Sequence, residues 1–107
     1  MTLREMTPRE YAARAEAGPA PLLLDVREGW ELAIARLDGV LHIPMGEIPA
    51  RLGELAPEQE IVVLCRSGGR SATVARFLQQ QGYRNVWNLA GGILAWSEQL
   101  DPSLTQY

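Results

Sequence analysis

The chain contains no lysine, one cysteine and one histidine among its 107 residues. All ten basic residues are arginine, which excludes catalysis through a lysine Schiff base or a lysine general base. A single cysteine excludes an internal disulfide and a metal site made of several thiolates. We therefore expect no metal and no other cofactor. What remains available is one reactive thiol and a set of arginines that can bind anions.

Long apolar runs and an excess of positive charge are also missing. The longest apolar runs, residues 22–24 and 61–65, are too short to cross a bilayer, and the N-terminal stretch MTLREMTPREY lacks the apolar segment of a signal peptide. The net charge is −3 and no basic stripe is present, which argues against a nucleic-acid partner. We expect a cytoplasmic protein of one domain, residues 1–107, that is a monomer or a weak dimer.

Short apolar runs alternate with helical patterns along the chain. Strands read as short apolar or β-branched runs bounded by turn residues, and helices as a cap followed by helical spacing. The expected elements are a helix at 7–16, a strand at 22–26, a helix at 28–33, a strand at 40–43, a helical stretch at 47–55, a strand at 61–64, a helix at 71–81, a strand at 85–89 and a helix that ends near Leu100. This alternation predicts an α/β fold with a mostly parallel sheet covered by helices on both faces. We expect residues 102–107 to be a loose tail.

The cysteine stands where such folds place their ligands. Cys65 directly follows the strand at 61–64, which is β-branched, apolar on both faces and therefore expected at the centre of the sheet. Ligands of parallel sheets bind beyond the carboxyl ends of the strands. Cys65 is the candidate nucleophile.

The loop after Cys65 has the composition of an anion-binding cradle. Glycines at 68 and 69 permit the tight turns that let backbone N–H groups converge on one point, and we expect Ser71 to cap the helix that follows. The helix start and two arginines add positive charge, which favours a thiolate and an anionic substrate. The candidate substrate-binding residues are Arg66, Ser67, Gly68, Gly69, Arg70 and Ser71.

The two arginines of the loop have different expected roles. Arg66 directly follows the nucleophile and is expected to meet solvent and the incoming donor. Arg70 precedes the helix, where its side chain either folds back to brace the loop or points into the cradle.

Four segments resemble the rhodanese family of sulfurtransferases. The stretch CRSGGRS is similar to the family's active-site loop C-R-x-G-x-R-S, and LLLDVREGWEL, GVLHIPM and NVWNLAGGILAW are similar to three further family segments in the same order. The resemblance implies a three-layer fold with a five-stranded parallel sheet. It also implies transfer of a sulfane sulfur from a donor such as thiosulfate, through a Cys65 persulfide, to cyanide or a thiol. A small molecule or a sulfur-carrier protein would supply or accept the sulfur. At residues 35–38 the chain reads ARLD, where the family usually has G-H-I-P.

Two other functions remain as alternatives. Cysteine phosphatases have five residues between cysteine and arginine, whereas four residues separate Cys65 from Arg70 here. The shorter loop favours one sulfur atom over a phosphoryl group. Rhodanese-like domains also occur as non-catalytic carrier or regulatory modules, which have often lost the cysteine; this chain has kept it.

Residues outside the loop are expected to support it. Asp25 and Arg27 point the same way from one strand end and are expected to form a buried pair or to brace the loop. The single histidine, His42, is expected to be structural. Trp30 is the tryptophan expected to line the site. The pair Gly91-Gly92 is expected to let the backbone approach the cysteine loop closely.

Overall fold

A five-stranded parallel sheet forms the centre of the protein in a computed structural model, which describes residues 2–107. The strands are β1 (Arg4–Met6), β2 (Leu22–Asp25), β3 (Leu41–His42), β4 (Ile61–Leu64) and β5 (Val86–Leu89). Their spatial order is β1-β5-β4-β2-β3, and every pairing between them is parallel. β4 therefore lies in the middle of the sheet, and the predicted α/β class with a five-stranded parallel sheet is confirmed.

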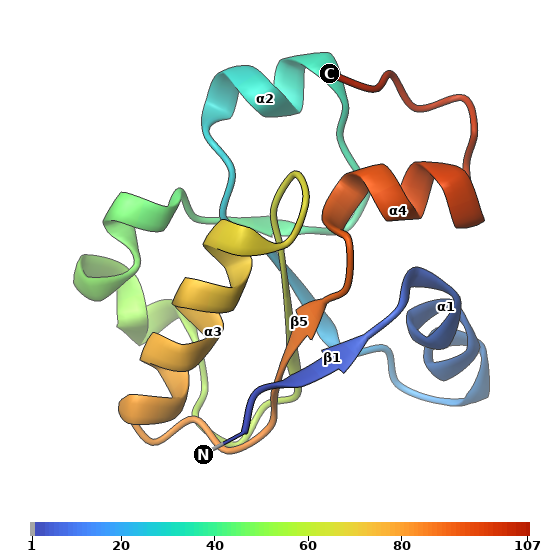
Figure 1. Cartoon of the computed structure of the whole chain (residues 1–107). Coiled ribbons are helices and arrows are strands. Elements are labelled where there is room, and N and C mark those ends of the chain that lie inside the picture. The colour runs from blue at the N-terminus through green and yellow to red at the C-terminus, as the bar shows by residue number, and fades with distance from the viewer. Residues whose placement is uncertain (1) are drawn as a thin grey trace.

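Helices cover both faces of this sheet (Figure 1). They are α1 (Pro8–Ala17), α2 (Gly29–Ile34), α3 (Gly69–Gln80) and α4 (Gly92–Gln99), together with two short 3-10 helices, η1 (Met45–Glu47) and η2 (Pro49–Glu54). In Figure 1, α3 and the 3-10 turns lie on one side of the strands, and α1 and α4 lie on the other. Within residues 2–107, no helix has the length and apolarity to span a bilayer.

The central strand explains why two separate cores form. Successive side chains of a strand point to opposite faces, and all four residues of β4 are fully buried. Ile61 and Val63 belong to the core under α3 and the 3-10 turns, whereas Val62 and Leu64 belong to the core under α1 and α4. A strand with helices on both faces must be apolar on both faces, as this one is.

One predicted element differs from the structure, and one strand of the structure has no predicted counterpart. The helical stretch expected at 47–55 is the pair of 3-10 turns η1 and η2, with non-helical dihedral angles at Arg51. Pro49 supplies no backbone N–H for an α-helical bond, and the turn ends where Tyr83 donates its hydroxyl to the carbonyl of Leu55 at 3.0 Å. Strand β1 was not predicted, because Arg4 and Glu5 are exposed and only Met6 is buried. Charged residues of this kind are typical of a short edge strand.

The start of α3 is the third difference, and it matters for the site. The helix begins at Gly69, with Gly68 as its N-cap in a left-handed conformation (φ 112°). Ser71 therefore lies inside the first turn and does not cap the helix, contrary to the prediction. Its side chain is free to turn inward, where it is completely buried beside Cys65.

Candidate functional site

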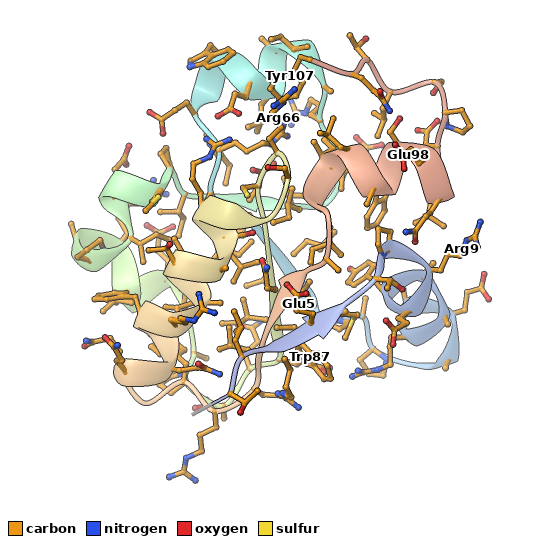
Figure 2. All side chains as sticks on the ribbon, in the orientation of Figure 1. Glu5, Arg9, Arg66, Trp87, Glu98 and Tyr107 are labelled. Atoms are coloured by element: carbon orange, nitrogen blue, oxygen red, sulfur yellow. The ribbon has the colours of Figure 1, made fainter. Side chains whose placement is uncertain are left out.

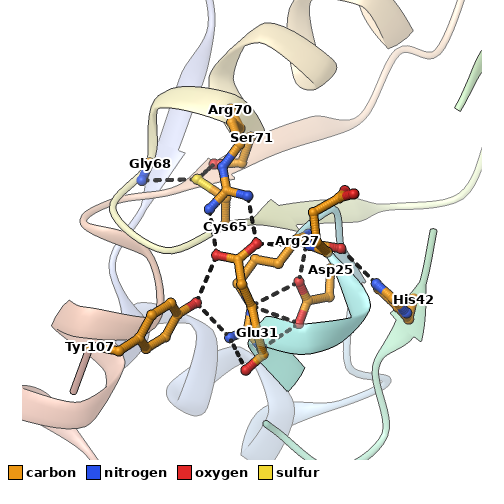
Figure 3. A network of polar contacts seen from close by, with 10 residues as sticks. Asp25, Arg27, Glu31, His42, Cys65, Gly68, Arg70, Ser71 and Tyr107 are labelled. Carbon is orange, nitrogen blue, oxygen red and sulfur yellow. Dashed lines mark hydrogen bonds and ion pairs between the residues drawn. The ribbon is translucent and has the colours of Figure 1, made fainter. Parts of the chain in front are cut away.

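Cys65 lies at the carboxyl end of β4 with its sulfur facing the loop that follows (Figure 3). The residue is 1% exposed. Its Sγ accepts a hydrogen bond from the backbone N–H of Gly68 at 3.1 Å, and the hydroxyl oxygen of Ser71 lies 3.3 Å away. The sulfur is thus held at the floor of a cradle made of main-chain and hydroxyl groups.

The beginning of α4 holds this loop in shape. The backbone N–H of Ile93 donates to the carbonyl of Cys65 at 2.9 Å, and that of Leu94 donates to the carbonyl of Arg66 at 3.2 Å. Gly92 makes this approach feasible, since a Cβ atom there would lie 2.4 Å from the carbonyl oxygen of Arg66. The expected close approach of Gly91-Gly92 to the cysteine loop is confirmed. Because the carbonyl groups of the cysteine loop point toward α4, the N–H groups of the same loop can face the sulfur.

The hydrogen-bond donors around the sulfur favour the thiolate form of Cys65. Burial raises the pKa of the thiol, because a charged sulfur is poorly solvated there, but hydrogen bonds outweigh this effect. The hydroxyl and N–H of Ser71 and the N–H groups of Gly68 and Ser67 stabilise the thiolate, so that the pKa of Cys65 lies below its ordinary value. The thiolate is the nucleophilic form of cysteine. This arrangement can therefore present a reactive sulfur.

Arg70 contacts α2 through Glu31, with its guanidinium close enough to Cys65 for an electrostatic interaction. Its Nη1 and Nη2 atoms donate to the two carboxylate oxygens of Glu31 at 2.7 and 2.8 Å. Glu31 is 2% exposed, and its hydrogen bonds with Arg70 hold the pKa of its carboxyl at about 2, against the opposing effect of burial. Of the two roles expected for Arg70, the contact with Glu31 fits the bracing one. Glu31 itself carried no sequence signal for this contact beyond its place in the first turn of a short helix.

A second, fully buried ion pair lies beneath the first. Arg27 donates through Nη2 to Asp25 at 2.8 Å, and both side chains are 0% exposed. Its Nη1 continues to the hydroxyl of Tyr107 at 2.9 Å. The expected buried pair of Asp25 and Arg27 is confirmed. His42 has a structural role here, because its Nε2 lies 2.6 Å from the carbonyl oxygen of Arg27.

The C-terminal residue takes part in this network, which sequence reasoning missed. The Tyr107 hydroxyl donates to Glu31 at 3.0 Å, and Leu104 and Tyr107 pack against the core below α4. The tail was expected to be loose; instead its contacts anchor it. A tyrosine eight residues beyond the end of α4 at Gln99 has no motif that would have indicated this role.

Arg66 and Trp30 form the outer rim next to Tyr107 (Figure 2 shows Arg66 and Tyr107 together). The guanidinium carbon of Arg66 lies 5.2 Å from the centre of the Tyr107 ring, within the range of a cation–π contact. Within residues 2–107, no carboxylate lies at ion-pair distance from Arg66, which is exposed as predicted. Trp30 is 64% exposed and packs edge-on against Tyr107. Trp30 is therefore part of the outer rim and does not form a wall of the cradle.

The residues that the structure describes contain no cluster of three or more side chains suited to a metal ion. A parallel sheet that holds one cysteine sulfur in a loop of N–H groups at a strand end belongs to the class of α/β folds whose ligands bind at this edge of the sheet. Comparison with known proteins narrows this class. A model of the rhodanese-like domain family matches residues 7–99, and the chain belongs to that family.

Three relatives illustrate the similarity. The chain is 36% identical over 102 residues to the Bacillus subtilis protein YtwF, covering 95% of this chain and 98% of YtwF. It is 43% identical over 76 residues to a sulfurtransferase of Allochromatium vinosum, covering 71% of each. The solved structure of a rhodanese-like domain protein from Staphylococcus aureus matches with a TM-score of 0.85 at 27% identity, covering 98% of this chain and 99% of that one.

Proposed function

We propose that this protein is a sulfurtransferase that accepts a sulfane sulfur from thiosulfate as a persulfide on Cys65 and passes it to a thiophilic acceptor. The observation that carries the proposal is the Cys65 sulfur, held by Gly68 N–H at 3.1 Å in a loop with four residues between Cys65 and Arg70. Membership of the rhodanese-like domain family and similarity to a protein named a sulfurtransferase support it.

The first half of the reaction loads the cysteine. The Cys65 thiolate attacks the outer sulfur of thiosulfate, an Sγ–S bond forms, and the sulfur–sulfur bond of the donor breaks. Sulfite leaves with the electron pair of that bond, and the negative charge of the thiolate passes to the outer sulfur of the persulfide. Sulfite is a stable anion, so its departure needs no general acid. Arg66 supplies an exposed positive charge at the rim, where a dianionic donor arrives.

The second half unloads it. Cyanide, or the thiolate of an acceptor, attacks the outer sulfur and forms a new bond to carbon or sulfur. The Sγ–S bond breaks, and the cysteine returns to its thiolate form. Two separate half-reactions with one covalent intermediate predict ping-pong kinetics.

Phosphate chemistry fits the site less well. A phosphatase cradle needs its arginine to bind the transferring phosphoryl group, whereas both terminal nitrogens of Arg70 are engaged by Glu31. A phosphatase also needs a general acid for the leaving oxygen. We therefore expect aryl phosphate turnover that depends on Cys65 to be slower than thiosulfate turnover.

Intact-mass spectrometry tests the proposal most directly. Incubation with thiosulfate should add one sulfur atom to the protein, and cyanide should then remove it and release thiocyanate. The variant Cys65→Ser should do neither, while its thermal unfolding matches that of the wild type. Thiocyanate formation by Cys65→Ser at the wild-type rate would rule out the mechanism. Stoichiometric loading without turnover of small acceptors would instead favour a sulfur-carrier module.

A further inference from the structure

The hydroxyl group of Ser71 lies between two acceptors, the sulfur of Cys65 and the buried side-chain amide of Asn88. The Ser71 oxygen lies 3.3 Å from Cys65 Sγ and 2.5 Å from the carbonyl oxygen Oδ1 of Asn88 in β5. All three residues are at most 2% exposed. A serine hydroxyl has one proton, so Ser71 can donate to only one of these two acceptors at a time.

The surroundings of Asn88 fix which way its amide points. Its Nδ2 group donates to the carbonyl of Gly68 at 3.1 Å and to a carboxylate oxygen of Glu5 at 2.8 Å. Both of these partners are acceptors, so they require the NH₂ end of the amide. Oδ1 therefore faces Ser71 and can only accept a proton from it.

This arrangement satisfies every group when Cys65 is a neutral thiol. Ser71 donates to Asn88, and the thiol S–H donates to the Ser71 oxygen. Formation of the thiolate changes the balance, because the charged sulfur now competes with Oδ1 for the single Ser71 proton. Whichever acceptor loses is left short of a donor in a buried place, which has a cost.

We infer that Asn88 is a positioning residue that controls the reactivity of Cys65 through Ser71. Its carbonyl oxygen accepts the hydrogen bond of the Ser71 hydroxyl while the cysteine is a thiol. When the thiolate forms, the Ser71 hydroxyl donates to Sγ instead. Asn88 thereby restrains the stabilisation of the thiolate that the loop would otherwise provide. This part of the inference does not depend on the identity of the substrate.

A second consequence rests on the proposed function. In a persulfide the negative charge sits on the outer sulfur, and Sγ becomes an uncharged divalent sulfur, which is a weak acceptor. The Ser71 hydroxyl then returns to Asn88, and both groups are again paired. The Asn88 carbonyl thus favours the sulfur-loaded state over the free thiolate.

The test is the pH dependence of Cys65 alkylation by iodoacetamide, with Asn88→Leu as the main variant. Leucine keeps the branching of asparagine but removes Oδ1, so Ser71 is free to donate to the sulfur. We expect the pKa of Cys65 to fall by about one unit, because one hydrogen bond to a charged group and one pKa unit have similar free energies. A purely structural role predicts the opposite sign, since loss of the bond to Gly68 would loosen the loop and remove donors from the thiolate.

The background Ser71→Ala separates the two routes. If Asn88 acts through Ser71, Asn88→Leu should leave the pKa of Cys65 unchanged when Ser71 is already alanine. Asn85→Leu is the matched control, because the same substitution there removes only an exposed contact with Arg4. These variants substitute none of the other charged and titratable residues around the network, although Asn88→Leu removes the hydrogen bond to Glu5. Those residues are Glu5, Asp25, Arg27, Glu31, Arg66, Arg70 and Tyr107.

Two further variants keep the test decisive if Asn88→Leu unfolds. Asn88→Ala should also lower the pKa of Cys65, and Asn88→Asp, which keeps an acceptor and adds charge, should raise it by an amount that shrinks in Ser71→Ala. A rise or no change in Asn88→Leu or Asn88→Ala, or an equal fall in the Ser71→Ala background, would overturn the inference. Alkylation uses no sulfur donor, so its result stands apart from success or failure of thiosulfate turnover.

Discussion

Arg70 and Glu31 join the cysteine loop to α2 through two parallel hydrogen bonds of 2.7 and 2.8 Å. Glu31 also fixes the start of its own helix, because it accepts from the N–H of Glu28 at 2.8 Å, and it accepts from Tyr107 as well. One buried carboxylate thus connects the loop, the short helix and the C-terminal tail (Figure 3).

Replacement of this carboxylate should therefore affect both stability and activity. Glu31→Gln keeps the size of the side chain but leaves Arg70 without a charged partner, so we expect the free energy of unfolding to fall by about 1–3 kcal/mol. We also expect kcat to fall, since the loop that holds the sulfur loses its brace. Urea denaturation and steady-state kinetics measure the two effects. Glu54→Gln is the control, because it breaks an exposed pair with Arg51 and should change stability by less than about 0.5 kcal/mol.

The same contact predicts how stability changes in acid. Hydrogen bonds with Arg70 lower the pKa of Glu31 in the folded protein to about 2, from an ordinary value of 4.5. A depressed folded-state pKa means that the unfolded chain binds the proton more readily, so this contribution to stability is complete above about pH 4.5 and is lost as the pH falls toward 2. Unfolding free energies between pH 5 and pH 2 should fall less steeply in Glu31→Gln than in the wild type. Parallel curves would show that Glu31 has no such role.

Gly92 should tolerate no side chain. A Cβ atom there would lie 2.4 Å from the carbonyl oxygen of Arg66 and 2.6 Å from that of Cys65, and the backbone has a positive φ of 61°. We expect Gly92→Ala to lose about 3 kcal/mol of stability from crowding and strain, and to lose activity by displacement of the loop. Gly53→Ala is the matched control, since nothing lies within 4 Å of its added atom. Thermal unfolding of the two variants should differ clearly, and similar melting temperatures would contradict the proposed close contact.

Arg66 should matter for donor capture more than for chemistry. Its charge is exposed at the rim, so Arg66→Ala should raise KM for thiosulfate by about tenfold with a smaller change in kcat. The loss should shrink with a neutral persulfide donor and at high salt, where screening already weakens the attraction. Arg84→Ala, which removes another exposed arginine, controls for net charge. Equal losses with charged and neutral donors would show that Arg66 does not recruit anions.

The sequence predicted best where local chemistry decides the structure. The start of α1 followed from a capping box, in which Thr7 and Glu10 each bond to the backbone of the other, and β4 followed from a run that is apolar on both faces. The place of Cys65 followed from the end of that strand. These features depend on a few neighbouring residues.

Other parts could not be predicted because they depend on contacts between distant residues. Strand β1 is held by pairing with β5, about eighty residues further along the chain. The exposed charged residues of β1 are as typical of a loop as of a strand. Ser71 was expected as a helix cap, but the left-handed turn at Gly68 starts the helix earlier and directs the hydroxyl to the sulfur. The anchoring of Tyr107 likewise needs Arg27 and Glu31 to be in place first.

The burial of Cys65 also disfavours a disulfide between two molecules of the protein. A disulfide requires two sulfur atoms about 2 Å apart with their Cβ atoms about 4 Å apart. Cys65 is only 1% exposed, so the surrounding loop keeps its sulfur from approaching the sulfur of a second molecule this closely. The geometry therefore disfavours dimers cross-linked through Cys65.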